Sequence, residues 1–318
     1  MIENLKDKGL FIFSDPGGAK PILAFIKLNN LKNYKVISDR NYKFYDEFQI
    51  NVEICPTYIA NEIIDKYKPD YIFTGTSYTS SIELKFLYEA KEQKIKTYSF
   101  VDHYTRYRER FLLDGENIFP DKVFLTDDKA KRLAESVGIS KYSKVKVSGN
   151  FYHEFLKKWK PSKSKKNIFP SFNLDQKIIL FAPDPLSNIN GQKDFLFDET
   201  DVWKDLMQAI NNHLGHLEIL LVIKFHPNQN EKYLKTFINK NPIKNFFITS
   251  TIDTNSLIYY SDLIIGMYSS LLIEANLMKK KTLRHIPFPQ KDDPLDHLGI
   301  GIISNDIKSL IKNISSSF

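Results

Sequence analysis

Short apolar runs alternate with segments of helical period along the chain, and this alternation constrains the fold more than any other feature. The first half is predicted to hold several strands with helical segments between them. The strands are expected at residues 9–14, 35–38, 71–74, 96–101, 122–126 and 144–148, and the helices at residues 21–28, 58–66, 80–93 and 129–136. Strands that alternate with helices of this length form βαβ units, so the pattern predicts a parallel sheet in an open α/β domain.

A lysine-rich stretch, KKWKPSKSKK at residues 157–166, interrupts the alternation and is typical of a solvated connection between domains. Beyond it, strands are expected at residues 177–182, 218–225, 245–248, 262–265, 282–285 and 301–303, and helices at residues 202–213, 231–238, 255–259, 271–278 and 307–314. We therefore expect two Rossmann-like α/β domains, at residues 1–155 and 156–318, that face each other across a cleft. Ligands of such folds bind at the carboxyl ends of the strands.

The composition excludes several classes of protein. A chain of 318 residues is long enough for two domains, at about 100–200 residues per domain. The single cysteine, Cys55, excludes a disulfide framework, a zinc ribbon and a CxxC redox site, and it suits a reducing compartment. No apolar run approaches the roughly 18 residues of a membrane span, and the first residues lack the apolar segment of a secretory signal. We therefore expect a cytoplasmic protein.

The net charge of +7, from 45 lysines and arginines against 38 acidic residues, is compatible with an anionic partner. The abundance of Lys, Asn, Ile, Phe and Tyr is also typical of an AT-rich genome, which raises the lysine content without a functional reason. Signatures of the RRM, KH, zinc and helix-turn-helix classes are missing. We therefore expect no nucleic-acid partner, and a basic nucleic-acid-binding protein remains the non-enzyme alternative. A basic chain can also be attracted to anionic small molecules or to a membrane surface.

Two polar loops follow predicted strands of the first half. The sequence SDPGGA at residues 14–19 places Asp15, Gly17 and Gly18 before a helix, where backbone N–H groups can approach an anion. The sequence TGTSY at residues 74–78 has the same position after another strand and offers the hydroxyl groups of Thr76 and Ser77. Both loops are candidate substrate-binding segments, and a tight turn explains the first loop equally well.

The sequence FVDHYTRYRERF at residues 100–111 concentrates polar chemistry at the end of a predicted strand. Asp102 and His103 follow that strand directly, where sites of α/β domains form. An aspartate near cationic groups can stay ionised and act as a general base, so Asp102 and His103 are the catalytic candidates. Three arginines of this stretch can bind a carboxylate or phosphate in bidentate fashion. They are Arg106, Arg108 and Arg110.

Polar residues also follow strand ends in the second half. His226 and Pro227 come after the strand at residues 218–225, where an imidazole can donate to a phosphate oxygen. The sequence DLIIGMYSSLLIEA at residues 262–275 combines a buried strand, a turn and a helix start, and N–H groups and hydroxyls at such a start form a cradle for an anion. The candidate nucleotide-binding residues in this stretch are Gly266, Ser269, Ser270 and Glu274. Asp184, in a Pro-Asp-Pro turn, is a candidate substrate contact, and no metal site is expected.

The His226-Pro227 pair, followed by Gly266, the serine pair and Glu274-Ala275, resembles the C-terminal half of GT-B glycosyltransferases. More narrowly, it is similar to bacterial transferases that use CMP-activated sialic acid or Kdo. The resemblance implies that His226 contacts the phosphate or cytidine, the serines the phosphate, and Glu274 the ribose. It also implies an acidic base in a short Asp/Glu-Asp/Glu-Gly motif, which this chain lacks intact. Asp102-His103 lies in an equivalent place, and Asp114-Gly115 is a partial match.

These features predict a metal-independent glycosyltransferase that needs no cofactor besides its nucleotide-sugar donor. A CMP-activated acidic sugar is the favoured donor and a surface glycan or lipid-linked glycan the expected acceptor, as in capsule or lipopolysaccharide biosynthesis. Peripheral association with the inner membrane fits the basic charge. The same pattern also resembles CDP-glycerol glycerophosphotransferases and, more loosely, UDP-GlcNAc 2-epimerases and UDP-sugar hydrolases. An epimerase or hydrolase would turn over its substrate with no acceptor present.

Overall fold

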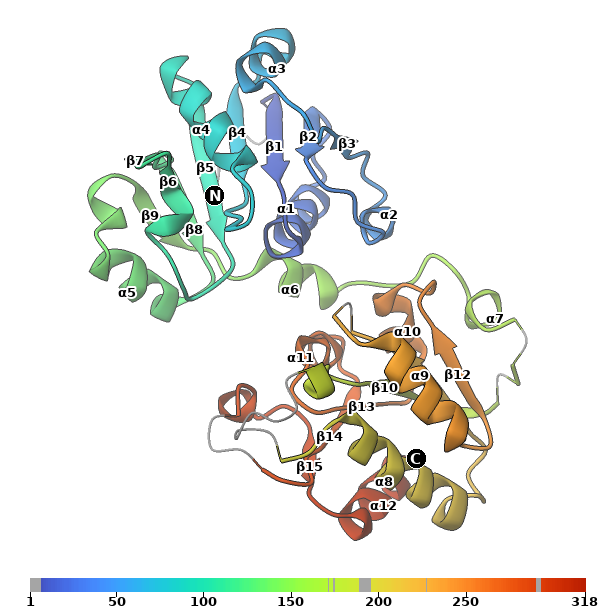
Figure 1. Cartoon of the computed structure of the whole chain (residues 1–318). Helices are drawn as coiled ribbons and strands as arrows, with labels where there is room; N and C mark the ends of the chain where they lie inside the picture. Colours follow the sequence, from blue (N-terminus) through green and yellow to red (C-terminus); the bar gives the residue numbers. More distant parts are fainter. Residues whose placement is uncertain (1–6, 171, 174, 189–195, 227, 290–292) are drawn as a thin grey trace. The chain divides into compact units, whose positions relative to one another are not determined.

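The computed structural model describes residues 7–318, apart from residues 171, 174, 189–195, 227 and 290–292. The chain divides into two compact units, Met1–Leu156 and Lys157–Phe318. Each unit contains an extended parallel β-sheet with helices packed against it (Figure 1). The predicted class, α/β with two Rossmann-like halves, is therefore confirmed.

The first unit has a sheet of seven parallel strands in the order β3-β2-β1-β4-β5-β8-β9. The strands are β1 (Gly9–Phe13), β2 (Tyr34–Ser38), β3 (Glu53–Ile54), β4 (Tyr71–Thr74), β5 (Lys96–Val101), β8 (Lys122–Leu125) and β9 (Lys144–Val147). The helices are α1 (Pro16–Leu28), α2 (Tyr45–Phe48), α3 (Ala60–Tyr67), α4 (Ile82–Glu92), α5 (Asp128–Ser136) and α6 (Phe151–Leu156), with the 3-10 helices η1 (Glu109–Phe111) and η2 (Ile139–Lys141). A hairpin pairs β6 (Leu112–Leu113) with β7 (Glu116–Asn117).

Helices cover both faces of this sheet. On one face, Leu10 and Ile12 of β1 pack in a cluster with Phe86 of α4. On the other face, the ring of Phe25 in α1 lies 6.4 Å from that of Phe11 and 5.2 Å from that of Phe73. A strand buried on both faces is apolar along most of its length, which explains why the nearly continuous apolar runs predicted these strands.

The second unit has six parallel strands in the order β12-β11-β10-β13-β14-β15. The strands are β10 (Lys177–Ala182), β11 (Ile219–Lys224), β12 (Phe246–Thr249), β13 (Leu263–Gly266), β14 (Lys281–His285) and β15 (Ile302–Ser304). The helices are α7 (Lys165–Ile168), α8 (Glu199–His213), α9 (Glu231–Lys240), α10 (Thr254–Tyr260), α11 (Ser270–Leu277) and α12 (Ile307–Ser315), with η3 (Leu186–Asn188) and η4 (Asp296–Leu298). Alternate strand residues face opposite layers: Ile179 packs with α8, α9 and α12, and Leu180 packs with α10 and α11.

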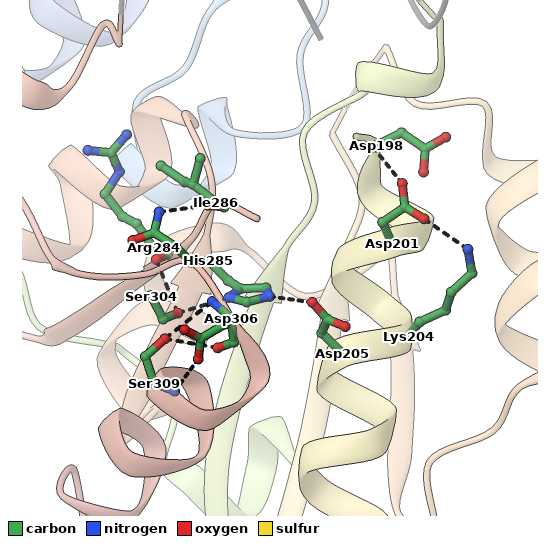
Figure 2. Close-up of polar contacts among 11 residues, drawn as sticks. Asp198, Asp201, Lys204, Asp205, Arg284, His285, Ile286, Ser304, Asp306 and Ser309 are labelled. Carbon is green, nitrogen blue, oxygen red and sulfur yellow. Dashed lines mark hydrogen bonds and ion pairs between the residues drawn. The ribbon is translucent and has the colours of Figure 1, made fainter. Parts of the chain in front are cut away.

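A buried histidine ties three elements of the second unit together (Figure 2). His285 of β14 is fully buried, and its Nε2 lies 2.8 Å from Oδ2 of Asp205 in α8. Its Nδ1 lies 2.9 Å from Oγ of Ser304 in β15. At its start, α8 carries a capping box made by Asp198 and Asp201. The cap and the histidine together fix the position of α8 on the sheet.

The lysine-rich stretch at residues 157–166 belongs to the second unit and is packed in part, in contrast to the expected solvated connection. The ring of Trp159 lies 6.0 Å from that of Tyr259 in α10. The hydroxyl of Tyr260 donates a 2.7 Å hydrogen bond to the backbone carbonyl of Lys163. Aromatic side chains of α10 therefore give this stretch a surface to pack on.

Among the described residues, none of the helices has the length and apolar character of a membrane span. In the same residues, no three His, Cys, Asp or Glu side chains are grouped so that they could hold a metal ion. The thiol of Cys55 is free and half-buried.

In each unit the strand order reverses beside one strand, and ligands of open α/β sheets bind at such reversals. In the first unit, β2 and β3 lie on one side of β1, and β4 and the later strands lie on the other. The loops after β1 and β4 meet there through two glycines. A Cβ atom on Gly75 would lie 3.0 Å from the Cα of Gly18, and one on Gly18 would lie 3.1 Å from the Cα of Gly75. The backbones therefore approach too closely for a side chain.

We expect Gly75→Ala to destabilise the first unit by about 1–3 kcal/mol, because the added methyl group must push a backbone segment away. Gly215→Ala is the matched control, since the nearest atom to its added Cβ is 3.9 Å away. Calorimetric unfolding of the two variants and the native chain measures the effect. Equal stability of the two variants would contradict the close contact.

Candidate functional site

The candidate site of the first unit lies at the carboxyl edge of its sheet, and one buried carboxylate organises it. Glu83 of α4 is 2% exposed. Its Oε1 accepts hydrogen bonds from the backbone N–H groups of Ser14, at 3.1 Å, and Ser77, at 3.2 Å. These two residues belong to the loops after β1 and β4, so Glu83 ties together the loops at the strand reversal.

Burial raises the pKa of Glu83 to about 8, although backbone N–H groups oppose the shift. Its Oε2 is buried without a hydrogen-bond partner among the described residues. Sequence reasoning missed this residue. One signal was available: Glu83 lies four residues before Leu87 and seven before Ala90, which places a carboxylate on the apolar face of a helix.

The predicted residues Asp15, Gly17, Gly18 and Asp102 lie together at this edge. Asp15 caps α1 by accepting a 3.0 Å hydrogen bond from the N–H of Gly18. A Cβ atom on Gly17 would lie only 2.1 Å from Oδ2 of Asp102. The carboxylate of Asp102 therefore reaches the start of α1 because position 17 carries no side chain.

Asp102 is paired with a buried cation. Its Oδ1 lies 3.8 Å from Nη1 of Arg110, and the two side chains are 20% and 9% exposed. Arg110 also donates from Nε to the carbonyl of Thr105 at 3.1 Å and from Nη1 to the carbonyl of Thr76. Burial raises the pKa of Asp102, while the charge of Arg110 opposes the rise. A carboxyl group balanced in this way suits general acid–base chemistry.

The other predicted residues of the loop after β5 do not gather around Asp102. The guanidinium of Arg106 lies 4.2 Å from the ring centroid of Tyr78, and Arg108 is exposed. His103 is exposed as well, and its Nδ1 lies 2.9 Å from Oγ1 of Thr105. The structure therefore brings one of the three arginines, Arg110, to the predicted base.

Thr76 and Ser77 are buried in the loop after β4. Oγ1 of Thr76 donates a 3.2 Å hydrogen bond to the carbonyl of Phe100, and Oγ of Ser77 accepts one of 3.3 Å from the N–H of Thr79. Both hydroxyls thus hold the loop in shape. Their role at the site is to position the backbone beside Glu83 and Arg110.

In the second unit, the strand reversal falls between β10 and β13, and a buried carboxylate again joins the two loops. Asp184 follows β10 and is 8% exposed. Its Oδ2 accepts a 2.9 Å hydrogen bond from the N–H of Tyr268, in the loop after β13. Burial raises the pKa of Asp184 to about 6, against the opposing effect of backbone N–H groups of residues 267–269. These N–H groups are therefore directed at Asp184.

The predicted serine pair starts helix α11. Ser269 is its N-cap, and its Oγ accepts a 3.3 Å hydrogen bond from the N–H of Leu271. Ser270 is the first helical residue and is exposed, and Glu274 lies half-buried one turn later. Gly266 ends β13, where an added Cβ atom would lie 3.2 Å from the carbonyl of Ala182. The positive end of the helix dipole therefore carries an accessible hydroxyl.

His226 is half-buried beyond the end of β11, and Pro227 lies outside the described residues. Nδ1 of His226 accepts a 3.1 Å hydrogen bond from the N–H of Asn228, and burial lowers the pKa of the imidazole. A neutral imidazole whose Nδ1 accepts carries its proton on Nε2, which can donate to an anionic ligand. Beside it, the fully buried Glu199 accepts hydrogen bonds from Gln229 and from the N–H of Ser187.

A buried arginine that sequence reasoning missed supports the loop after β13. Arg284 of β14 is 1% exposed and donates a 2.9 Å hydrogen bond from Nε to the carbonyl of Met267. Its Nη2 lies 2.5 Å from Oδ2 of Asp293, and its guanidinium lies 5.7 Å from the ring centroid of Tyr268. An arginine within a predicted strand of a parallel sheet was the available signal, because such a strand is buried and a buried charge needs a partner.

The sequence matches no protein-family model and no curated protein. Solved structures do resemble the chain. The UDP-GlcNAc 2-epimerase of Methanocaldococcus jannaschii shares 17% identity at a TM-score of 0.66, over 97% of this chain and 92% of that one. The Neisseria meningitidis UDP-GlcNAc 2-epimerase bound to UDP-GlcNAc shares 16% identity at a TM-score of 0.59, over 97% and 91%. The glycotransferase of kitacinnamycin shares 11% identity at a TM-score of 0.54, over 98% and 90%.

At these identities, the likeness shows a shared fold. It extends over nearly the whole chain and nearly the whole of each solved structure. The chain therefore has the fold of enzymes that act on nucleotide sugars.

The raised pKa of Glu83 predicts a pH dependence of stability. Its pKa is about 8 in the folded chain against its usual 4.5, so the folded state binds the proton more tightly. The contribution of this group to the free energy of unfolding therefore falls as the pH rises from about 4.5 to 8. Glu83→Gln keeps the acceptor oxygen but cannot ionise, so its stability should fall less over this range. Calorimetry at several pH values measures the difference.

Glu92→Gln, at an exposed position in the same helix, is the control and should follow the native pH dependence. If Glu83→Gln shows the native dependence too, the carboxyl group of Glu83 ionises as it does in water, and its assignment as a neutral buried group fails.

Proposed function

We propose that the chain is an enzyme that acts on a nucleotide sugar without a separate acceptor, as a 2-epimerase or a hydrolase. The observation that carries the proposal is Asp102, whose carboxyl group lies 3.8 Å from Arg110 and has a pKa raised by burial. The likeness to two UDP-GlcNAc 2-epimerases over 97% of the chain supports UDP-GlcNAc as the first substrate to test.

The proposal assigns the nucleotide to the second unit. The start of α11 offers the positive end of the helix dipole and the exposed hydroxyl of Ser270 to a phosphate. His226 adds an Nε2–H donor and stays neutral near pH 7, because burial lowers its pKa. Glu274, one turn into α11, is a candidate partner for the ribose hydroxyls. Asp184 holds the loop between β13 and α11 in place by accepting a hydrogen bond from the N–H of Tyr268.

The proposal assigns the proton transfer to the first unit. Inversion of a sugar carbon that carries hydrogen breaks a C–H bond, and the proton must return to the opposite face. Asp102 suits one half of this exchange, because burial raises the pKa of its carboxyl group and so makes the carboxylate a stronger base than an aspartate in water. Arg110 stabilises the ionised form and fixes its orientation. A hydrolase would use the same carboxylate to activate water.

A glycosyltransferase is the second candidate, with CMP-activated acidic sugar as donor and a glycan as acceptor. The likeness to the glycotransferase of kitacinnamycin over 98% of the chain favours it, as does the serine pair at α11. In that reaction, Asp102 would remove a proton from the acceptor hydroxyl. The transferase differs from the epimerase and the hydrolase in one measurable respect: it needs an acceptor.

We expect the protein to convert UDP-GlcNAc in the absence of any acceptor, with Asp102→Asn slower by about 100-fold or more. Nuclear magnetic resonance in D₂O separates the products: an epimerase introduces deuterium at the inverted carbon, whereas a hydrolase releases the sugar without exchange. Asp114→Asn is the control, since Asp114 lies in the exposed β6–β7 turn. If the protein turns over only a CMP-sugar and only when a glycan acceptor is present, it is a glycosyltransferase, and the assignment as an epimerase or hydrolase is wrong.

We expect Ser270→Asp to weaken nucleotide binding about tenfold or more, because its carboxylate repels the phosphate at the start of α11. The folded state should lose no stability, since an acidic residue in the first turn interacts favourably with the helix dipole. Thr254→Asp makes the same charge change at the first residue of α10 and serves as the control. The melting temperature, measured without and with UDP, CMP, CDP and GDP, reports both the stability and the nucleotide binding of each variant. If the nucleotides raise the melting temperatures of the two variants equally, the nucleotide does not bind at α11.

A further inference from the structure

A cavity in the first unit lies at the amino-terminal edge of its sheet, opposite the edge of the candidate site. Its volume is about 970 Å³, and seven lysines line it. Three of them, Lys96, Lys122 and Lys144, are the first residues of β5, β8 and β9. Lys122 and Lys144 are direct neighbours in the register of β8 and β9. Like charges at paired positions repel each other, so this arrangement costs stability in the unliganded chain.

Two acidic residues, Asp121 and Glu135, line the cavity, too few to balance its seven lysines. Oδ2 of Asp121 accepts hydrogen bonds of 2.8 and 2.9 Å from the N–H and hydroxyl of Thr97. Glu135 is paired with Lys131, at 3.9 Å. The side chains of Lys96 and Lys144 are exposed, and no ion pair joins either of them to another described residue. The lining thus carries an excess of positive charge.

The second unit provides an internal comparison. Its sheet also has a cavity at the amino-terminal edge, of about 780 Å³, beside the first residues of β11 and β12 and the residue before β10. This cavity lies on the other side of the strand reversal from the position that the lysine-lined cavity has in the first unit. A single lysine, Lys244, and a single acidic residue, Glu218, line it. An amino-terminal edge of a parallel sheet in this lysine-rich chain therefore does not by itself gather lysines.

We propose that the lysine-lined cavity of the first unit binds a ligand that carries several phosphate groups. Lysine ammonium groups on flexible stems adapt to phosphates in different positions, and each donates up to three hydrogen bonds. Binding also relieves the repulsion between Lys122 and Lys144. The site is separate from the one proposed for catalysis, because the two lie at opposite ends of the same strands. The phosphates can belong to a soluble oligophosphate or to the headgroups of an anionic membrane.

The test uses the full chain with Lys96→Glu, Lys141→Glu and Lys144→Glu combined. These residues are exposed and line the cavity, outside the proposed catalytic and nucleotide sites. The matched control combines Lys158→Glu, Lys160→Glu and Lys163→Glu, three exposed lysines of the 157–166 stretch, with the same change in net charge. Tripolyphosphate binding is measured by calorimetry, and sedimentation with vesicles of phosphatidylglycerol in phosphatidylcholine is measured beside pure phosphatidylcholine. Circular dichroism checks that both variants are folded.

We expect the cavity variant to lose affinity for one of the two phosphate probes by tenfold or more, while the control keeps native affinity. Loss of tripolyphosphate binding alone identifies a soluble ligand, and loss of vesicle binding alone identifies the lipid headgroup. Equal losses in the two variants would show a non-specific effect of net charge and overturn the proposal. So would failure of the native chain to bind either probe at physiological salt. If the cavity variant does not fold, the combination Lys96→Gln, Lys141→Gln and Lys144→Gln replaces it. Its binding to the two probes is then compared with that of Lys158→Gln, Lys160→Gln and Lys163→Gln, and the same outcomes support or overturn the proposal.

Discussion

A buried carboxylate joins the two loops at the strand reversal of each unit, and the candidate sites depend on it. In the first unit Glu83 accepts from the N–H groups of Ser14 and Ser77, and in the second Asp184 accepts from the N–H of Tyr268. An acceptor shared by both loops fixes their spacing at the place where the strand order reverses. Burial raises the pKa of both carboxyl groups, which is the cost of placing them there.

The two edges of the first sheet carry different chemistry. At the carboxyl edge, glycine loops and Glu83 leave room for Asp102 and Arg110, a carboxylate paired with a cation. At the amino edge, strands begin with lysine and leave a positive cavity. A parallel sheet separates these edges by the length of its strands, so one unit can offer an acid–base site and an anion site without interference.

The apolar runs predicted both sheets, because strands buried on two faces are apolar along most of their length. The two-residue strand β3 and the β6–β7 hairpin escaped prediction, since so short a run shows no period. For the candidate sites, polar residues directly after strands were the useful signal, and Asp15, Gly17, Gly18 and Asp102 do lie together. Glu83 and Arg284 were missed because their partners are backbone groups and an acid in distant loops.

The sequence by itself determined the class of fold and the edge of each sheet where polar loops gather, because both follow from local patterns of burial and from where strands end. Only the tertiary structure decided which of Arg106, Arg108 and Arg110 meets Asp102, and that N–H groups before α11 face Asp184. It also decided that Lys96, Lys122 and Lys144 share one cavity. The three lysines, and the loops that carry Asp184 and Tyr268, become neighbours through strand order, and no local pattern records strand order.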